Sequence, residues 1–246
     1  MLVSRNWDIG HPSEPSLGEI VTTNNISDKK KPVRKRMTQA ERTAISDKRM
    51  FQAAIKLINQ HGTHNTTLKD IGELAGYSRG LASARFGSKL ELLDEVSEKF
   101  YTNWSERTRQ VIGDKRGIEA IMLAFDLVGV NIGADTDLAR ASYIVSYETL
   151  ASNPSKRERL TKRHEDHRQQ FAEWLQQAID RGEAKSDRSP RQFGIEVSAV
   201  IFGLVYQWIV DPHALDLEAE LGAYLHALLD DIVVPERRGQ LIKAAE

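Results

Sequence analysis

The sequence contains no cysteine, so disulfides and thiolate metal ligands are excluded. None of its apolar runs is expected to span a bilayer, which takes roughly 20 consecutive residues. The first 28 residues lack the apolar segment of a secretory signal. We therefore expect a cytoplasmic protein without membrane contact.

The formal net charge is only −1, but the charge is unevenly distributed along the chain. Residues 29–95 contain 14 Lys and Arg against 7 Asp and Glu, whereas the remaining residues contain 20 against 28. A basic segment favours polyanions and an acidic one avoids them. This asymmetry predicts a polyanion-binding part joined to a larger acidic part.

Residues 1–37 are expected to form a disordered N-terminal extension, because their scattered Pro, Gly, Ser, Asn and Asp show no apolar periodicity. The extension contains the basic run Lys29–Arg36. This run is interpreted either as a solvated linker or as an arm that contacts DNA phosphates.

The rest of the sequence predicts an all-α fold. A capping box at Thr38–Glu41 marks the first helix start, an apolar stripe from Met50 to Ile58 follows, and Gly62 ends the helix. Ser189-Pro190 is a further clear start signal. Eight more helices are predicted, over residues 68–75, 78–86, 89–110, 117–132, 137–151, 155–181, 190–210 and 217–233.

The segment Thr66–Lys89 predicts a helix-turn-helix, with Gly76 relaxing the backbone at the turn. A helix that lies in the DNA major groove needs a slim profile and hydrogen-bond donors. The second helix has both. Its outward positions are expected to be Ser78, Arg79, Gly80, Ala82, Ser83, Ala84 and Arg85. Free N–H groups where the next helix begins, at Lys89, are suited to binding a phosphate.

These motifs, TTLKDI from Thr66, AGYSRG from Ala75 and FGSKLELL from Phe86, resemble those of the TetR/AcrR family of bacterial regulators. The match covers about Arg49–Leu93, and the rest of the chain agrees only in its helix pattern. The resemblance implies an N-terminal three-helix DNA-binding domain and a C-terminal helical bundle. It also implies a homodimer, usually a repressor, that releases its operator when the C-terminal domain binds a small molecule.

The resemblance therefore divides the chain into four parts, of which the first is the N-terminal extension 1–37. Residues 38–93 would form the DNA-binding domain, residues 94–235 the helical ligand-binding and dimerisation domain, and residues 236–246 a C-terminal tail. No cofactor and no metal is expected. The partners would be double-stranded operator DNA, a second copy of the chain and an unknown small-molecule effector.

Residues for DNA contact are implied position by position. They are Thr67, Lys69, Ser78, Arg79, Gly80, Leu81, Ser83, Arg85 and Lys89. The family's phosphate-binding Tyr is replaced here by Ser83, whose hydroxyl has a shorter reach. The usual His is replaced by Arg85, whose long and permanently charged side chain is expected to keep the phosphate contact.

Aromatic residues at inward helix positions are candidates for lining a ligand pocket, with ordinary core packing as the alternative. They are Trp104, Phe125, Tyr143, Tyr147, Phe171, Trp174 and Tyr206. The apolar stripes within Ile195–Ile209 and Leu217–Ile232 could form a core hairpin or a four-helix dimer interface, and the resemblance favours the interface. Its candidate residues are Ile201, Val205, Trp208, Leu221, Leu225 and Leu228.

Other functions are less well supported by the sequence. An enzyme with an appended DNA-binding head would need a nucleophile–His–acid set or a glycine-rich phosphate loop, and neither is recognisable. A ligand-independent architectural or adaptor protein remains an alternative. His164 and His167 could form a metal pair, but the run around them is saturated with charge and is interpreted as a solvated helix face.

Overall fold

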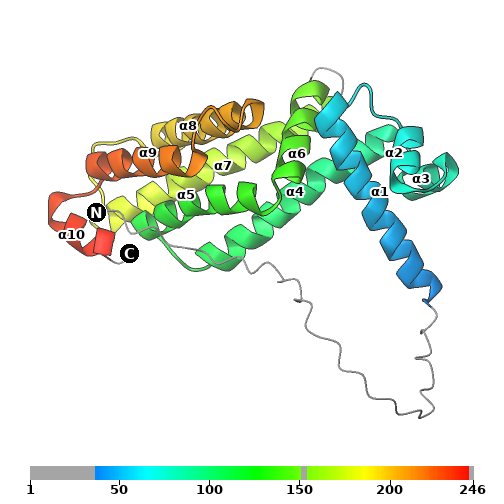
Figure 1. Cartoon of the computed structure of the whole chain (residues 1–246). Helices are drawn as coiled ribbons and strands as arrows, with labels where there is room; N and C mark the ends of the chain where they lie inside the picture. The colour runs from blue at the N-terminus through cyan, green and yellow to red at the C-terminus, as the bar shows by residue number, and fades with distance from the viewer. Residues whose placement is uncertain (1–36, 151–153, 244–246) are drawn as a thin grey trace, which may run out of the picture. The chain divides into compact units, whose positions relative to one another are not determined.

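The computed structural model describes residues 37–150 and 154–243. Within these ranges the protein is helical, with one isolated antiparallel bridge between Ala184 and Val233 (Figure 1). The helices are α1 Gln39–His61, α2 Leu68–Ala75, α3 Arg79–Phe86, α4 Lys89–Ile112, α5 Gly117–Ala134, α6 Thr136–Thr149, α7 Pro154–Asp180, α8 Pro190–Val210, α9 Leu217–Ile232 and α10 Pro235–Lys243. The all-α prediction is confirmed. The basic run Lys29–Arg36 lies outside the described residues.

The N-terminal helices α1 to α3 and the start of α4 share one apolar core. Met50 and Ile58 of α1, Ile71 of α2, Phe86 of α3 and Leu92 of α4 are all buried in it. Local capping fixes the ends of these helices, because the predicted capping box at residues 38–41 is present and a second one lies at residues 88–91. We call residues 38–93 the head. Its structure is determined by local capping and by a few shared apolar contacts.

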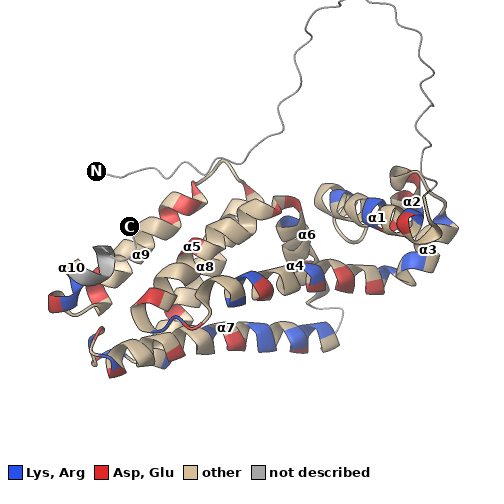
Figure 2. Ribbon diagram, turned by 90° about the horizontal axis from the view of Figure 1, so that it is seen from below, with Lys and Arg blue, Asp and Glu red and all other residues tan. Residues whose placement is uncertain are grey.

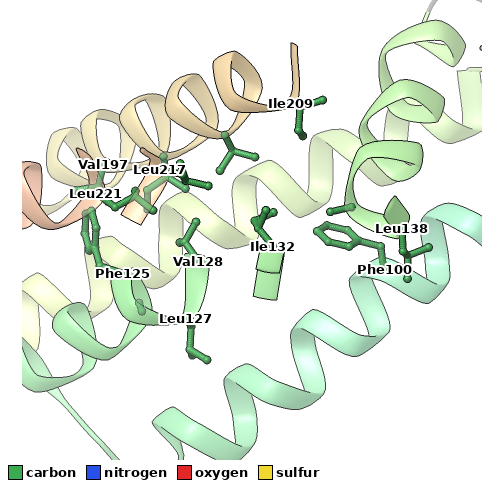
Figure 3. Close-up of a cluster of buried hydrophobic side chains, with 14 of the residues drawn as sticks. Phe100, Phe125, Leu127, Val128, Ile132, Leu138, Val197, Ile209, Leu217 and Leu221 are labelled. Atoms are coloured by element: carbon green, nitrogen blue, oxygen red, sulfur yellow. The ribbon is translucent and has the colours of Figure 1, made fainter. Parts of the chain in front are cut away.

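We call the described residues from 94 onwards the body. It is built around α5, which packs against α4, α7 and α9, while α7 packs along α8. Figure 3 shows apolar side chains from several helices meeting there, among them Phe125 and Ile132 of α5, Val197 of α8 and Leu221 of α9. Close packing of α7 on α8 requires Gly194, because a Cβ there would collide with the backbone oxygen of Arg168.

Two body helices, α5 and α8, are more apolar than expected. Helices α5 and α8 are long and apolar enough to cross a membrane by length and composition alone. In the structure, 50% of the α5 window and 39% of the α8 window is buried inside the protein, and both helices supply core residues. Their apolar character is accounted for by their place in the bundle.

The C-terminal segment differs from the predicted tail, because α10 begins at Pro235. Its sequence has no apolar stripe, and tertiary contacts hold it in place. The backbone N–H of Val234 donates to the Glu183 carbonyl at 3.0 Å, and Arg238 forms an ion pair with Asp230. The first of these contacts is long-range, and neither leaves a periodic pattern in the sequence.

The start of α5 depends on a residue far away in the chain. Arg116, at the N-cap, makes no side-chain cap hydrogen bond. The buried carboxylate of Glu183 instead accepts from the Ile118 N–H at 3.1 Å and from Arg181 Nε at 2.6 Å. Gly117 has a φ of 60°, and a Cβ there would collide with this carboxylate. Glu183 therefore acts as a remote cap for α5.

We predict that Glu183→Ala lowers the free energy of unfolding by about 1–3 kcal/mol, because it leaves a buried N–H without an acceptor. Denaturant titration followed by circular dichroism measures the change. Asp187→Ala, in the same connection but exposed, serves as the matched control and should change little. Equal stability of the two variants would contradict the capping role.

Candidate DNA-binding surface

The turn between α2 and α3 is set by two glycines. Gly76 ends α2 in the left-handed conformation, with φ 80° and ψ 29°, and nothing lies within 4 Å of where its Cβ would be. Gly72 lies inside α2, and a Cβ there would come within 2.9 Å of the backbone oxygen of Ser78. The predicted role of Gly76 is confirmed, whereas Gly72 was missed because a helical glycine carries no turn signal.

The two motif helices are capped by the hydroxyls of Thr67 and Ser78. Thr67 Oγ1 accepts from the Asp70 N–H at 3.2 Å and donates to the Asp70 carboxylate at 2.6 Å. Ser78 Oγ accepts from the Leu81 N–H at 3.2 Å. Both hydroxyls are exposed and already serve a helix end, so their first role is to fix where α2 and α3 begin.

Helix α3 has one buried and one exposed face. Ala82 and Phe86 are buried, so the expectation that Ala82 points outward is wrong. The exposed residues are Ser78, Arg79, Gly80, Leu81 and Ala84. Gly80 has no neighbour closer to its would-be Cβ than Ser78 Oγ, at 3.7 Å. The fold therefore does not require glycine at this position.

Charged residues lie on and beside α3, as the blue and red segments of the ribbon show at the α1–α3 end of the molecule in Figure 2. Lys69 is exposed and faces Glu73 of its own helix at 3.7 Å. Lys89 Nζ donates to the His64 carbonyl at 2.8 Å, which holds it at the start of α4. An ammonium has three donors, so Lys89 keeps capacity for a phosphate oxygen. Ser83 is only half-buried.

Arg85 lies differently from the other candidates. Its guanidinium donates to both carboxylate oxygens of Glu95 on α4, at 3.0 and 2.6 Å. Its Nε also lies 3.1 Å from a carboxylate oxygen of Asp47 on α1. The hydrogen bond to Glu95 is the main reason why the pKa of Arg85 is raised. Arg85 is thus committed to two protein carboxylates, against the expectation of a phosphate contact.

The candidate pocket aromatics fall into two groups instead of one. Phe125, Phe171 and Trp174 are buried and stack edge to face between α5 and α7. In the other group, Phe100 of α4 contacts Trp104 and Tyr143, and an exposed Tyr147 contacts an exposed Tyr206 at 5.2 Å between ring centroids. The first group is ordinary core in this structure.

A depression at the α4–α6–α7 junction has none of these aromatics in its walls. It encloses about 360 Å³, including space open to solvent, and its walls include Asp94, Glu98, Lys156, Arg159 and Arg163. Both carboxylates pair with the cations, at 2.5 to 3.8 Å. Local sequence patterns do not reveal this site, because the paired charges Asp94–Arg159 and Glu98–Arg163 lie 65 residues apart along the chain.

Most of the predicted interface residues are core residues of the single chain. Ile201, Val205, Leu221 and Leu228 are at most 5% exposed, and Trp208 and Leu225 are partly buried. The predicted stripes were correct as apolar faces, but they face the body's own core. The outward faces of α8 and α9 carry small and mixed residues instead. They include Ala199, Tyr206, Val210, Ala219, Ala223 and Ala227.

His164 and His167 interact with α8. His164 stacks on Phe202 at 4.7 Å between ring centroids, and His167 Nδ1 lies 2.8 Å from Ser198 Oγ. Burial lowers the pKa of His167 to about 4, so this ring is neutral at pH 7. The expected solvated face is therefore wrong for His167. Across the described ranges, no three His, Cys, Asp or Glu residues gather as metal ligands do.

Comparisons with known proteins agree with this geometry. The sequence model described as "Bacterial regulatory proteins, tetR family" matches residues 51–96. The HTH-type transcriptional regulator CymR of Pseudomonas putida is 37% identical over 75 residues. That alignment covers 30% of this chain and only 37% of CymR, so the sequence likeness is confined to a part of the relative.

Solved structures extend the likeness of the fold over most of the chain. A SmeT–triclosan complex has a TM-score of 0.64 at 21% identity, covering 77% of this chain and 92% of that one. A putative transcriptional regulator from Saccharomonospora viridis, in complex with choline, has a TM-score of 0.67 at 19% identity, covering 78% and 99%. Residues 51–96 therefore match the tetR family of bacterial regulatory proteins in sequence, and most of the chain matches solved regulators in fold.

Proposed function

We propose that this protein is a sequence-specific, DNA-binding regulator of transcription that acts as a homodimeric repressor and is released from its operator by a small molecule. The observation that carries the proposal is the exposed face of α3. That helix is anchored through Ala82 and Phe86 and presents Arg79, Gly80 and Ala84 outward. A slim helix with a cationic donor fits a DNA major groove.

Dimerisation follows from the limited reach of one such helix. A single recognition helix contacts only a few base pairs, and two helices held about one DNA turn apart contact enough for specificity. We propose that the outward faces of α8 and α9 form the interface. Their small side chains, such as Ala199 and Ala223, let helices of two copies approach closely.

The effector would bind in the body, where the partly exposed aromatic group and the charged depression offer contacts of different kinds. The solved structures with triclosan and with choline support a small-molecule ligand for this fold. An effector releases DNA only if its affinity differs between the DNA-bound and the free arrangement of the heads. We propose a cytoplasmic location, as for a protein that must reach operator DNA.

The alternatives predict different behaviour. A ligand-independent architectural protein would bind DNA and keep it in the presence of every body-binding small molecule. An enzyme would turn such a molecule over. Footprinting on the DNA upstream of its own gene, with and without candidate effectors, tests the proposal. A sequence-specific footprint that an effector removes is expected, and binding without sequence preference would overturn it.

We predict that Arg79 and Lys89 affect DNA binding in different ways. Arg79→Ala should cost about 1–3 kcal/mol of operator binding and relax the sequence preference, because its side chain would meet base edges. Lys89→Ala should weaken all sequences alike and flatten the salt dependence by about one unit, because it would meet a phosphate. Titration of operator and random duplexes at several salt concentrations measures both. Identical profiles for the two variants would contradict this assignment.

We predict that Gly80→Ala weakens operator binding while leaving the fold intact. The added methyl meets only Ser78 Oγ at 3.7 Å within the protein, and alanine favours a helix by up to about 1 kcal/mol. On DNA, the same methyl would lie on the groove face. Gly72→Ala is the contrasting variant, since its methyl collides with the Ser78 backbone and should lower the melting temperature. Undiminished affinity of Gly80→Ala would argue against a close approach of α3 to the groove.

We predict that Ala199→Glu together with Ala223→Glu converts the dimer to a folded monomer with weak operator binding. Both positions are exposed in the single chain, so the charges cost little unless a second copy covers them. Val205→Glu is the contrasting variant and should unfold the body, because Val205 is only 1% exposed. Sedimentation at micromolar concentration measures the change. A native monomer that binds its operator tightly would refute the dimer.

A further inference from the structure

Arg85 is the cation of α3 that the DNA-binding surface leaves unexplained. It lies in the last turn of the recognition helix, yet its guanidinium turns toward the protein. Both of its terminal nitrogens donate to Glu95 of α4, while its Nε faces Asp47 of α1. One side chain therefore links three helices of the head.

The geometry is that of a fixed clamp. A planar guanidinium that meets both oxygens of one carboxylate has its direction set by two parallel hydrogen bonds. The carbon at the centre of the guanidinium lies 4.8 Å from the ring centre of the buried Phe86, which limits the remaining freedom of the group. The side chain of Arg85 is 28% exposed, that of Asp47 33% and that of Glu95 38%, so solvent screens the clamp only in part.

The clamp acts on a short helix with few buried residues. Helix α3 has only eight residues, and its buried face offers just Ala82 and Phe86 to the core. The apolar contacts of Ala82 and Phe86 alone would allow the helix to tilt or to rotate about its axis. A bidentate contact at its C-terminal end, opposite the Ser78 cap at its N-terminal end, removes that freedom.

We propose that Arg85 is a positioning residue, which holds α3 at the angle for specific DNA recognition through Glu95 and Asp47 and does not bind phosphate itself. The proposal rests on the DNA-binding function proposed above. A residue that acts through helix orientation lowers specific binding and leaves the number of phosphate contacts unchanged. A phosphate-binding residue lowers specific and non-specific binding together and reduces the salt dependence.

The test uses the full-length protein with two DNA probes: a duplex selected from a random-sequence library by the wild-type protein, and poly(dI-dC). The variants are Arg85→Gln, Glu95→Gln and Asp47→Asn, each removing one charge of the clamp. Glu106→Gln, which alters an exposed carboxylate on the same helix α4, is the matched control. Affinities are measured at several salt concentrations, well below the melting temperature of each variant.

We expect Arg85→Gln and Glu95→Gln to lower the ratio of specific to non-specific affinity about tenfold, with Asp47→Asn lowering it less. The slope of log affinity against log salt on the selected duplex should stay at the wild-type value. The double variant Arg85→Gln/Glu95→Gln should lose no more than Arg85→Gln alone, because that substitution already breaks the contact with Glu95. Glu106→Gln should match the wild type.

Opposite results would overturn the proposal while keeping the DNA-binding function. They are a slope reduced by about 0.9 in Arg85→Gln, as for one lost phosphate contact, or unchanged specificity in Glu95→Gln. A wild-type protein that selects no duplex and binds poly(dI-dC) without salt dependence would instead refute the DNA-binding function itself. Melting curves of each variant separate a loss of specificity from a loss of fold.

Discussion

Helix α4 belongs to both parts of the protein, and the arrangement of everything else depends on how its first turns are held. Asp94 and Glu95 are adjacent residues that point to different partners. Glu95 binds Arg85 of the recognition helix, and Asp94 pairs with Lys156 and Arg159 of α7 at 3.1 and 2.9 Å. The recognition helix and α7 are therefore both held by ion pairs to the same turn of α4. Because most of these carboxylates and cations are partly exposed, their contribution depends on ionic strength more than the apolar contacts do.

Close backbone approach is the second constraint, and glycine provides it at two places. Gly72 lets α2 lie against the backbone that begins α3, and Gly194 lets α8 lie against the backbone of α7. Neither glycine is at a turn or has a left-handed conformation. Each is required because a Cβ at that position would collide with the neighbouring backbone. The angle between the two motif helices thus has a steric origin, whereas the ion pairs at Arg85 set a finer orientation.

The head could be predicted from the sequence because its determinants are local. Capping at Thr67 and Ser78 and the turn at Gly76 involve residues within a few positions of one another, and the structure confirms each. The DNA contacts at Arg79 and Lys89 stay a prediction. The role of Arg85 could not be predicted, because its partners lie 10 and 38 residues away and their direction depends on helix packing.

The body was predicted less well for the same physical reason. Apolar periodicity identifies a buried face and does not say whether the chain's own core or a second copy buries it. Val205 and Leu221 illustrate this, because both belong to the predicted apolar stripes and both lie inside the single chain. The Glu183 cap and helix α10 rest on contacts between distant segments, which local patterns do not encode.

If an effector binds the body as proposed, its signal would have two physical routes into the head. One is α4 itself, as a continuous helix. The other is the contact of α1 with α6, where the Thr63 N–H donates to Glu148 at 2.7 Å and Asn59 donates to the Asp137 carbonyl at 2.9 Å. Since α6 also contributes Tyr143 and Tyr147 to the aromatic group, a ligand bound there would displace the support of α1 directly. Because α1 carries Asp47, that displacement would reach Arg85 from the side opposite α4. Both routes thus converge on the orientation of α3 within the head.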